Sequence, residues 1–113
     1  MKNIKVYEEF ISDDLENKFL NLKKKWISEV AYQSNPSIVY ENSNYRNIID
    51  IGEKIVPFLI KDLNENNGDW LSALTEILRI NPVKKENEGN WDMMKENWNK
   101  YLNENGLINT TIS

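Results

Sequence analysis

The fold is decided by the stretch IVPFLIKDLNENNGDWLSALTEIL, residues 55–78. Apolar residues recur every three or four positions on both sides of its centre, which is the spacing of one face of an α-helix. The Asn-Asn-Gly sequence at residues 66–68 is a strong helix stop and turn, and Asp69 is expected to cap the second helix. The stretch therefore predicts a helical hairpin.

Further helices are expected on both sides of this hairpin. An apolar stripe at spacings of three and four predicts a helix that begins in a capping box at Asp13. Asn44 is expected to cap a short helix that Gly52 ends, and Asn90 to cap a last helix that Gly106 closes, with Leu107 or Ile108 folding back. No segment requires a β-sheet, so we expect an all-α fold of about five helices.

The remaining parts of the chain are expected to be irregular. Gln33 to Ser43 reads as a loop, because Pro36 disfavours helical geometry at Asn35. Residues 1–108 are expected to form a single domain and residues 109–113 a flexible tail. The chain has eighteen asparagines, which we expect on solvated surface except for four at caps and turns. These four are Asn44, Asn67, Asn81 and Asn90.

Composition restricts the chemistry. The 113 residues include no histidine and no cysteine, which excludes Ser-His-Asp and Cys-His triads and zinc sites built on imidazole or thiolate. The formal net charge of −4 argues against a nucleic-acid partner, which a basic face would normally bind. No signal peptide or long apolar run is visible, so we expect a cytoplasmic protein without a membrane partner.

An ordered set of motifs runs through the centre of the chain. It consists of Tyr-x-x-Ile-Ile from Tyr45, then Gly52, Pro57, Trp-x-x-Ala-Leu from Trp70, and Asn-Pro-Val at residues 81–83. This set resembles a family of small, uncharacterised bacterial proteins that is well represented in cyanobacteria. The similarity runs over most of the chain, and the resemblance implies no reaction, substrate or cofactor.

Two further features come from comparison with known patterns. Arg79 stands where members of that family tend to have glycine. The central hairpin also resembles one HEAT-type helical pair, in which Pro57 opens a leucine-rich helix and a second helix carries Trp70 and Ala73. Such pairs stack and offer a surface to other proteins, although a solenoid requires three or more of them.

Several polar motifs have a structural and a functional interpretation. Residues 62–69 resemble a calcium loop, but its sixth position is Asn67 rather than glycine and its twelfth is Ala73 rather than glutamate. We therefore expect a helix stop there. Three carboxylate pairs at helical spacing could hold a cation, but we expect them on a solvated face. These pairs are Asp50 with Glu53, Glu65 with Asp69, and Asp92 with Glu96.

The lysine cluster at residues 23–25 is the one basic run in the chain. Beside Trp26 it could form an anion-binding patch with an aromatic platform. Trp26 belongs to the apolar stripe of its helix, however, so we expect it in the core and the lysines on a solvated face.

The aromatic residues supply the candidate binding site. Tryptophan and tyrosine anchor many protein interfaces, and a small domain seldom buries four tryptophans completely. Most of this aromatic stripe is expected in the core, with part of it contacting a partner. The candidate protein-binding residues are Tyr45, Arg46, Trp91, Trp98 and Tyr101.

These observations favour a protein that binds another protein and is not an enzyme. Such a protein could be an immunity protein, an antitoxin or an inhibitor, with no cofactor required. Two alternatives remain open: an enzyme that uses Asp or Glu side chains with a divalent cation, and a nucleic-acid-associated regulator. The sequence specifies neither the partner nor the oligomeric state.

Overall fold

The computed structural model describes the backbone of residues 2–107 and the side chains of residues 14–107. Residues 2–107 form six α-helices and two short 3-10 helices, with no strand among them. The expected all-α fold is therefore confirmed. The chain divides into two compact units, Met1–Ile55 and Val56–Ser113, and the single domain expected for residues 1–108 stays a prediction. The expected tail at 109–113 lies outside the described residues.

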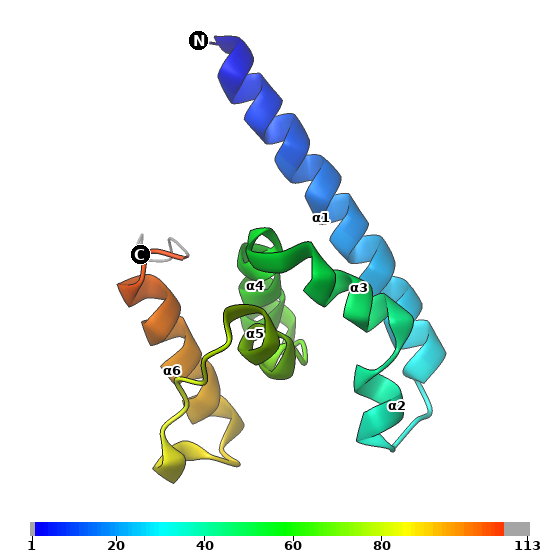
Figure 1. Cartoon of the computed structure of the whole chain (residues 1–113), viewed down its shortest axis with the longest axis vertical. Helices are drawn as coiled ribbons and strands as arrows, with labels where there is room; N and C mark the ends of the chain where they lie inside the picture. Colours follow the sequence, from blue (N-terminus) through cyan, green and yellow to red (C-terminus); the bar gives the residue numbers. More distant parts are fainter. Residues whose placement is uncertain (1, 108–113) are drawn as a thin grey trace. The chain divides into compact units, whose positions relative to one another are not determined.

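The first unit contains three α-helices and one 3-10 helix (Figure 1). They are α1 (Lys2–Val30), α2 (Pro36–Tyr40), α3 (Ser43–Ile51) and η1 (Gly52–Ile55). The predicted start of the first helix at Asp13 is wrong, because α1 is continuous from Lys2. No glycine or proline interrupts residues 2–30, so the helix continues through a sequence that could also have capped it.

The segment from Gln33 to Ser43 is not the loop that we expected, because α2 forms within it. Asn35 is extended, as the following proline requires, and its side chain accepts a hydrogen bond from the Ser37 backbone N–H at 2.9 Å. Pro36 then occupies the first turn, where its missing N–H costs nothing. The proline therefore begins a helix here instead of preventing one.

The cap of α3 also differs from the prediction. Asn42, and not Asn44, is the N-cap residue, and its side chain accepts from the Asn44 backbone N–H at 2.8 Å. Asn44 itself lies inside the helix and is buried. Gly52 follows the helix with a φ of 88°, as expected for the residue that ends it.

The core of the first unit joins α1 to α3. Phe19 and Trp26 of α1 are buried, as are Tyr45 and Ile48 of α3, and the two helices are in contact. The ring centroids of Trp26 and Tyr45 are 4.9 Å apart. The Trp26 indole N–H donates to the Val39 carbonyl at 2.8 Å, so the same side chain also fixes α2.

The second unit contains α4 (Val56–Asn66), α5 (Leu71–Leu78), the 3-10 helix η2 (Lys85–Asn87) and α6 (Trp91–Glu104) (Figure 1). Helices α4 and α5 are the two helices predicted for residues 55–78, whereas their resemblance to a HEAT-type pair stays a prediction. The buried hydrophobic residues of this unit come from all three α-helices and from the α4–α5 turn. They are Val56, Leu59, Ile60, Leu63, Trp70, Ala73, Leu74, Trp98 and Leu102.

Asparagine side chains link the elements of the second unit. Asn64 of α4 and Asn99 of α6 exchange two amide hydrogen bonds, at 2.8 and 2.9 Å. The Asn97 side chain accepts from the Lys84 backbone N–H at 2.9 Å and from the Asn87 side chain at 3.0 Å. Asn64 is exposed, as expected for asparagines outside the caps, whereas Asn87, Asn97 and Asn99 are half-buried and link elements of this unit.

The ends of α6 agree with the sequence prediction. The Asn90 side chain accepts from the Met93 backbone N–H at 3.1 Å. Gly106 has a φ of 69°, and the Leu107 N–H returns to the Leu102 carbonyl at 2.9 Å. Both the predicted cap and the predicted glycine closure are confirmed.

The ends of α5 depart from the common pattern. Trp70, and not Asp69, stands at the N-cap position, and no side chain caps the helix there. At the other end, Arg79 adopts a left-handed conformation with a φ of 58°. This conformation favours glycine, the residue that the family resemblance places at this position.

Candidate protein-interaction surface

Helix α1 carries two apolar stripes. Phe19 and Trp26, seven residues apart, are buried in the first unit. Leu20 and Ile27 come one position later, which turns them by roughly 100° around the helix axis. Leu20 is 47% exposed and Ile27 is 48% exposed. The second stripe is therefore an apolar strip of α1 that the fold leaves open to solvent.

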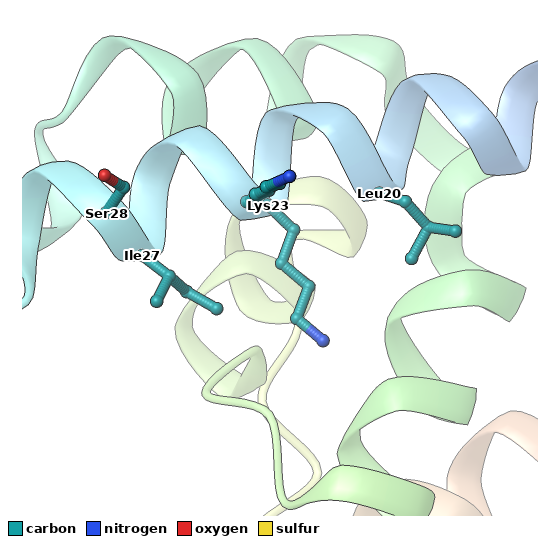
Figure 2. Close-up of a pocket in the computed structure, with 5 residues that line it drawn as sticks. Leu20, Lys23, Ile27 and Ser28 are labelled. Carbon is teal, nitrogen blue, oxygen red and sulfur yellow. The ribbon is translucent and has the colours of Figure 1, made fainter.

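A shallow pocket of about 430 Å³ lies along this second stripe. It is lined by Leu20, Lys23, Lys24, Ile27 and Ser28, and we call these five residues the α1 face. Figure 2 shows Leu20 and Ile27 projecting from the same side of the helix, with Lys23 between them. The lysines stand there because they follow Leu20 by three and four positions, which places them on the same helical face.

The structure divides the five residues predicted to bind a partner. Tyr45 and Trp98 are buried, at 0% and 1% exposure, which assigns them to the core of their units. Tyr45 packs against Trp26 and also against Tyr40, with ring centroids 5.4 Å apart in the second pair. These two residues therefore have no side-chain surface to offer a partner.

The other three predicted residues are partly exposed. Trp91 and Tyr101 lie on α6, where the Tyr101 ring meets Trp98 edge-on at 6.1 Å. Arg46 lies on α3 in the first unit. Their contact with a partner stays a prediction, and Arg46 belongs to a different unit from Trp91 and Tyr101.

Sequence reasoning missed the α1 face, although a signal for it was present. The predicted stripe of this helix contains Phe19 and Trp26, whose burial is confirmed. Leu20 and Ile27 repeat the same seven-residue spacing one position later. One helix can direct only one such stripe into a single core, so a second stripe was the pattern to look for.

The lysine cluster agrees only in part with its prediction. Trp26 is in the core, as expected, and its indole is turned to the Val39 carbonyl. Lys24 and Lys25 are exposed, and Lys23 is half-buried. Two of the three lysines nevertheless border the apolar pocket of the α1 face, so their surroundings are not purely solvent.

Residues 62–69, whose sequence resembles a calcium loop, form the end of α4 and the turn that follows it. Asp62 is buried, at 5% exposure, and its Oδ2 accepts from the Trp70 indole N–H at 2.7 Å. Its Oδ1 accepts from the Asn66 side chain at 2.8 Å. Both carboxylate oxygens therefore accept hydrogen bonds from residues at the turn between α4 and α5. The predicted helix stop after Asn66 is confirmed.

Gly68 completes the same turn. A Cβ atom at this position would lie 2.5 Å from Trp70 Nε1 and would also collide with the Asp62 carboxylate. Glycine is therefore required here by the close approach of its backbone to the Asp62–Trp70 hydrogen bond. The sequence identified this glycine as a turn signal, whereas the buried aspartate was not foreseen.

The three carboxylate pairs lie mostly on the surface, as expected. All of their residues except Asp69 are exposed. Within the described part of the chain, no group of three or more Asp or Glu side chains is placed to hold a metal ion. The cation-dependent enzyme therefore stays an untested alternative.

The described residues define an all-α protein with an apolar, lysine-flanked strip on its longest helix. The chain matches no family model, no curated protein and no solved structure. The resemblance to the small bacterial family therefore stays a prediction. No helix in residues 2–107 combines the length and the apolar character needed to cross a membrane.

Proposed function

We propose that this protein is a non-enzymatic binding module that acts by contacting another protein through the α1 face. The observation that carries the proposal is the exposure of Leu20 and Ile27 on one side of the helix, along a pocket of about 430 Å³. Single exposed apolar residues are common on protein surfaces. Leu20 and Ile27, however, line the same pocket, and exposed apolar residues that come together with polar residues around them are more typical of a protein interaction site.

The size of the strip supports a modest contribution to affinity. Burying an aliphatic side chain completely stabilises a complex by about 1.5–3 kcal/mol. Leu20 and Ile27 each have about half of their surface left to bury, so together they contribute about as much as one complete side chain. This corresponds to about a 10- to 100-fold effect on the dissociation constant. Additional contacts would come from the lysine stems, which are themselves apolar.

The kind of module follows from the sequence. The lack of histidine and cysteine and the resemblance to a HEAT-type hairpin both favour binding over catalysis. Within this class we propose an immunity protein, an antitoxin or an inhibitor, since a small helical protein is large enough to block one site on a partner. A toxin gene beside the gene for this protein would support that narrower proposal.

The test is affinity purification of the full-length chain from the organism that encodes it, followed by identification of the retained proteins. Leu20→Ser/Ile27→Ser is the test variant. We expect a defined protein to be retained by the wild type and lost with the double variant, because serine removes the apolar surface. The fold buries the other half of each side chain, so the free energy of unfolding should fall by about 1.5–3 kcal/mol, and circular dichroism at the purification temperature checks that the double variant is folded.

Ile38→Ser provides the matched control. Ile38 lies on α2 and is also 48% exposed, so it has the same chemistry and exposure at a different place. The control should retain the same partner as the wild type. Recovery of the wild type alone, or of an identical set of proteins with wild type and double variant, would contradict the proposed function.

A further inference from the structure

Two of the eighteen asparagines, Asn67 and Asn105, are followed directly by glycine. Asparagine is a thermolabile residue, and a following glycine makes it more reactive. The reason is that glycine has no side chain to hinder attack by its backbone nitrogen on the neighbouring side-chain amide. The two asparagines therefore have nearly the same intrinsic chemistry, and a large difference between them must come from the fold.

The reaction of an Asn-Gly sequence is deamidation. A hydroxide ion or a buffer base removes the proton from the glycine backbone nitrogen, which attacks the asparagine Cγ. The new C–N bond closes a five-membered succinimide ring, the bond from Cγ to Nδ2 breaks, and ammonia leaves. Water then adds to one of the two ring carbonyls. Opening at one carbonyl gives aspartate, and opening at the other gives isoaspartate, in which the main chain runs through Cγ.

The fold holds both reacting groups of the first Asn-Gly sequence. The Gly68 backbone N–H donates to the Asp62 carbonyl at 3.1 Å, and Asn67 Oδ1 accepts from Lys95 Nζ at 2.8 Å. Gly68 also lies so close to the buried hydrogen bond between Asp62 and Trp70 that a Cβ atom would collide with it. Freeing the Gly68 nitrogen for attack therefore requires opening a turn that is built on buried residues.

The second Asn-Gly sequence lies at the end of a helix. Asn105 is the C-cap residue of α6, beyond Leu102, and both Asn105 and Gly106 are exposed. The Gly106 backbone N–H donates to the Asn103 carbonyl at 3.2 Å, and Asn105 Nδ2 donates to the Tyr101 carbonyl at 2.8 Å. Helix ends open at a much lower free energy than segments packed in a core, so the Gly106 nitrogen is freed far more often than that of the first sequence.

We propose that Asn105 is a site of spontaneous covalent modification, where deamidation yields aspartate or isoaspartate, and that the fold protects Asn67 from the same reaction. Either product places a carboxylate beside the carbonyl groups that end α6, where negative charge is unfavourable. Either product also loses the amide donor to the Tyr101 carbonyl. The modification therefore loosens the closure in which the Leu107 N–H returns to the Leu102 carbonyl.

The experiment incubates the full-length chain at mildly alkaline pH and follows both asparagines by mass spectrometry of proteolytic peptides. A parallel incubation in guanidinium chloride measures the same two rates in the unfolded chain. We expect Asn105 to react at least about tenfold faster than Asn67 in the folded chain. The two rates should agree to within about threefold in the unfolded chain, because the protection depends on the fold.

Asn105→Asp reproduces the aspartate product and tests its effect on the helix end. Exchange of the Leu107 amide hydrogen with deuterium, followed by NMR, should become about two- to fivefold faster in this variant. Asn47→Asp is the matched control, because it makes the same change at an exposed position of α3 in the first unit. The control should leave the exchange of Leu107 unchanged.

Four outcomes would overturn the inference. Equal rates in the folded chain, or a faster rate at Asn67, would show that the α4–α5 turn gives no protection. A tenfold difference that persists in guanidinium chloride would assign it to the local sequence and not to the fold. A folded chain in which Asn105 does not react, while the unfolded chain does, would show that the end of α6 is protected as well. Unchanged exchange of Leu107 in Asn105→Asp would show that the new carboxylate does not loosen the helix end.

Discussion

The buried hydrogen bond between Asp62 and Trp70 leads to a quantitative prediction for unfolding. The two side chains are 5% and 0% exposed, and the Trp70 indole N–H donates to Asp62 Oδ2 at 2.7 Å. Asp62→Ala removes this acceptor and also the bond from Asn66. A hydrogen bond to a charged group contributes about 1.5–3 kcal/mol, and a buried donor left without its partner costs about 1–3 kcal/mol. We expect a loss of about 3 kcal/mol in the free energy of unfolding.

A double-mutant cycle isolates the pair from other effects of each substitution. Trp70→Phe removes the N–H but also reduces the volume of a fully buried ring. The stability lost in this single variant is therefore larger than the contribution of the hydrogen bond alone. The double variant Asp62→Ala/Trp70→Phe should be more stable than the sum of the two single effects predicts, by about 1.5–3 kcal/mol. Urea unfolding followed by far-UV circular dichroism measures this, because the signal comes from helices and not from tryptophan emission.

Trp26→Phe supplies the matched control for the cycle. Trp26 is also a buried tryptophan whose indole donates a hydrogen bond, but its acceptor is the Val39 carbonyl. The cycle that combines Trp26→Phe with Asp62→Ala should give an interaction free energy near zero. A coupling below about 0.5 kcal/mol between Asp62 and Trp70, or an equal coupling with Trp26, would refute the reasoning.

Three further changes test the turns and the amide pair by the same unfolding measurement. Arg79→Gly should stabilise the protein by about 0.5–1 kcal/mol, because the left-handed φ of 58° strains a residue with a side chain; a loss of stability would contradict this. Gly68→Ala should destabilise by about 1–3 kcal/mol, because its Cβ would collide with the Asp62–Trp70 pair, and unchanged stability would show that the turn adjusts. Asn99→Ala should cost about 0.5–1.5 kcal/mol through loss of the exchange with Asn64, whereas no cost would mean that water replaces both bonds.

Features set by neighbouring residues were the most predictable from the sequence. Asn90 caps α6 by reaching a backbone N–H three residues away, and Gly106 adopts the positive φ that ends the same helix. Both effects act within one turn of helix, so the residue types alone indicate them. The two helices of residues 55–78 and the turn between them were predictable for the same reason, since the apolar spacing and the Asn-Asn-Gly sequence are local signals.

Choices between competing local signals were less predictable. Asn35 and Pro36 fit a loop and also fit the start of a helix, and the structure contains the helix α2. Asn42 and Asn44 can both act as caps, but only Asn42 does, while Asn44 is buried within α3. Packing against the rest of the unit determines which of two possible local structures forms. That packing cannot be deduced from a single sequence.

Contacts between distant residues were not predictable at all from the residue types. Asp62 reaches Trp70 across a turn, and Asn64 reaches Asn99 from a different helix. Aspartate and asparagine are usually exposed, so the sequence favours solvent for each of them. Their burial or pairing depends on which donor the fold brings within about 3 Å, and that depends on the tertiary arrangement of the unit.

The residues proposed for binding differ from those that form the core of the first unit. Substitutions can therefore test partner binding and folding stability separately. On α1, Phe19 and Trp26 are buried whereas Leu20 and Ile27, one position later, are about half exposed. A change in the buried stripe acts on stability through lost packing, whereas a change at Leu20 or Ile27 also removes surface that the folded chain leaves exposed. A partner that distinguishes wild type from Leu20→Ser/Ile27→Ser, under conditions in which both are folded, would therefore be recognising the α1 face and not the folded state in general.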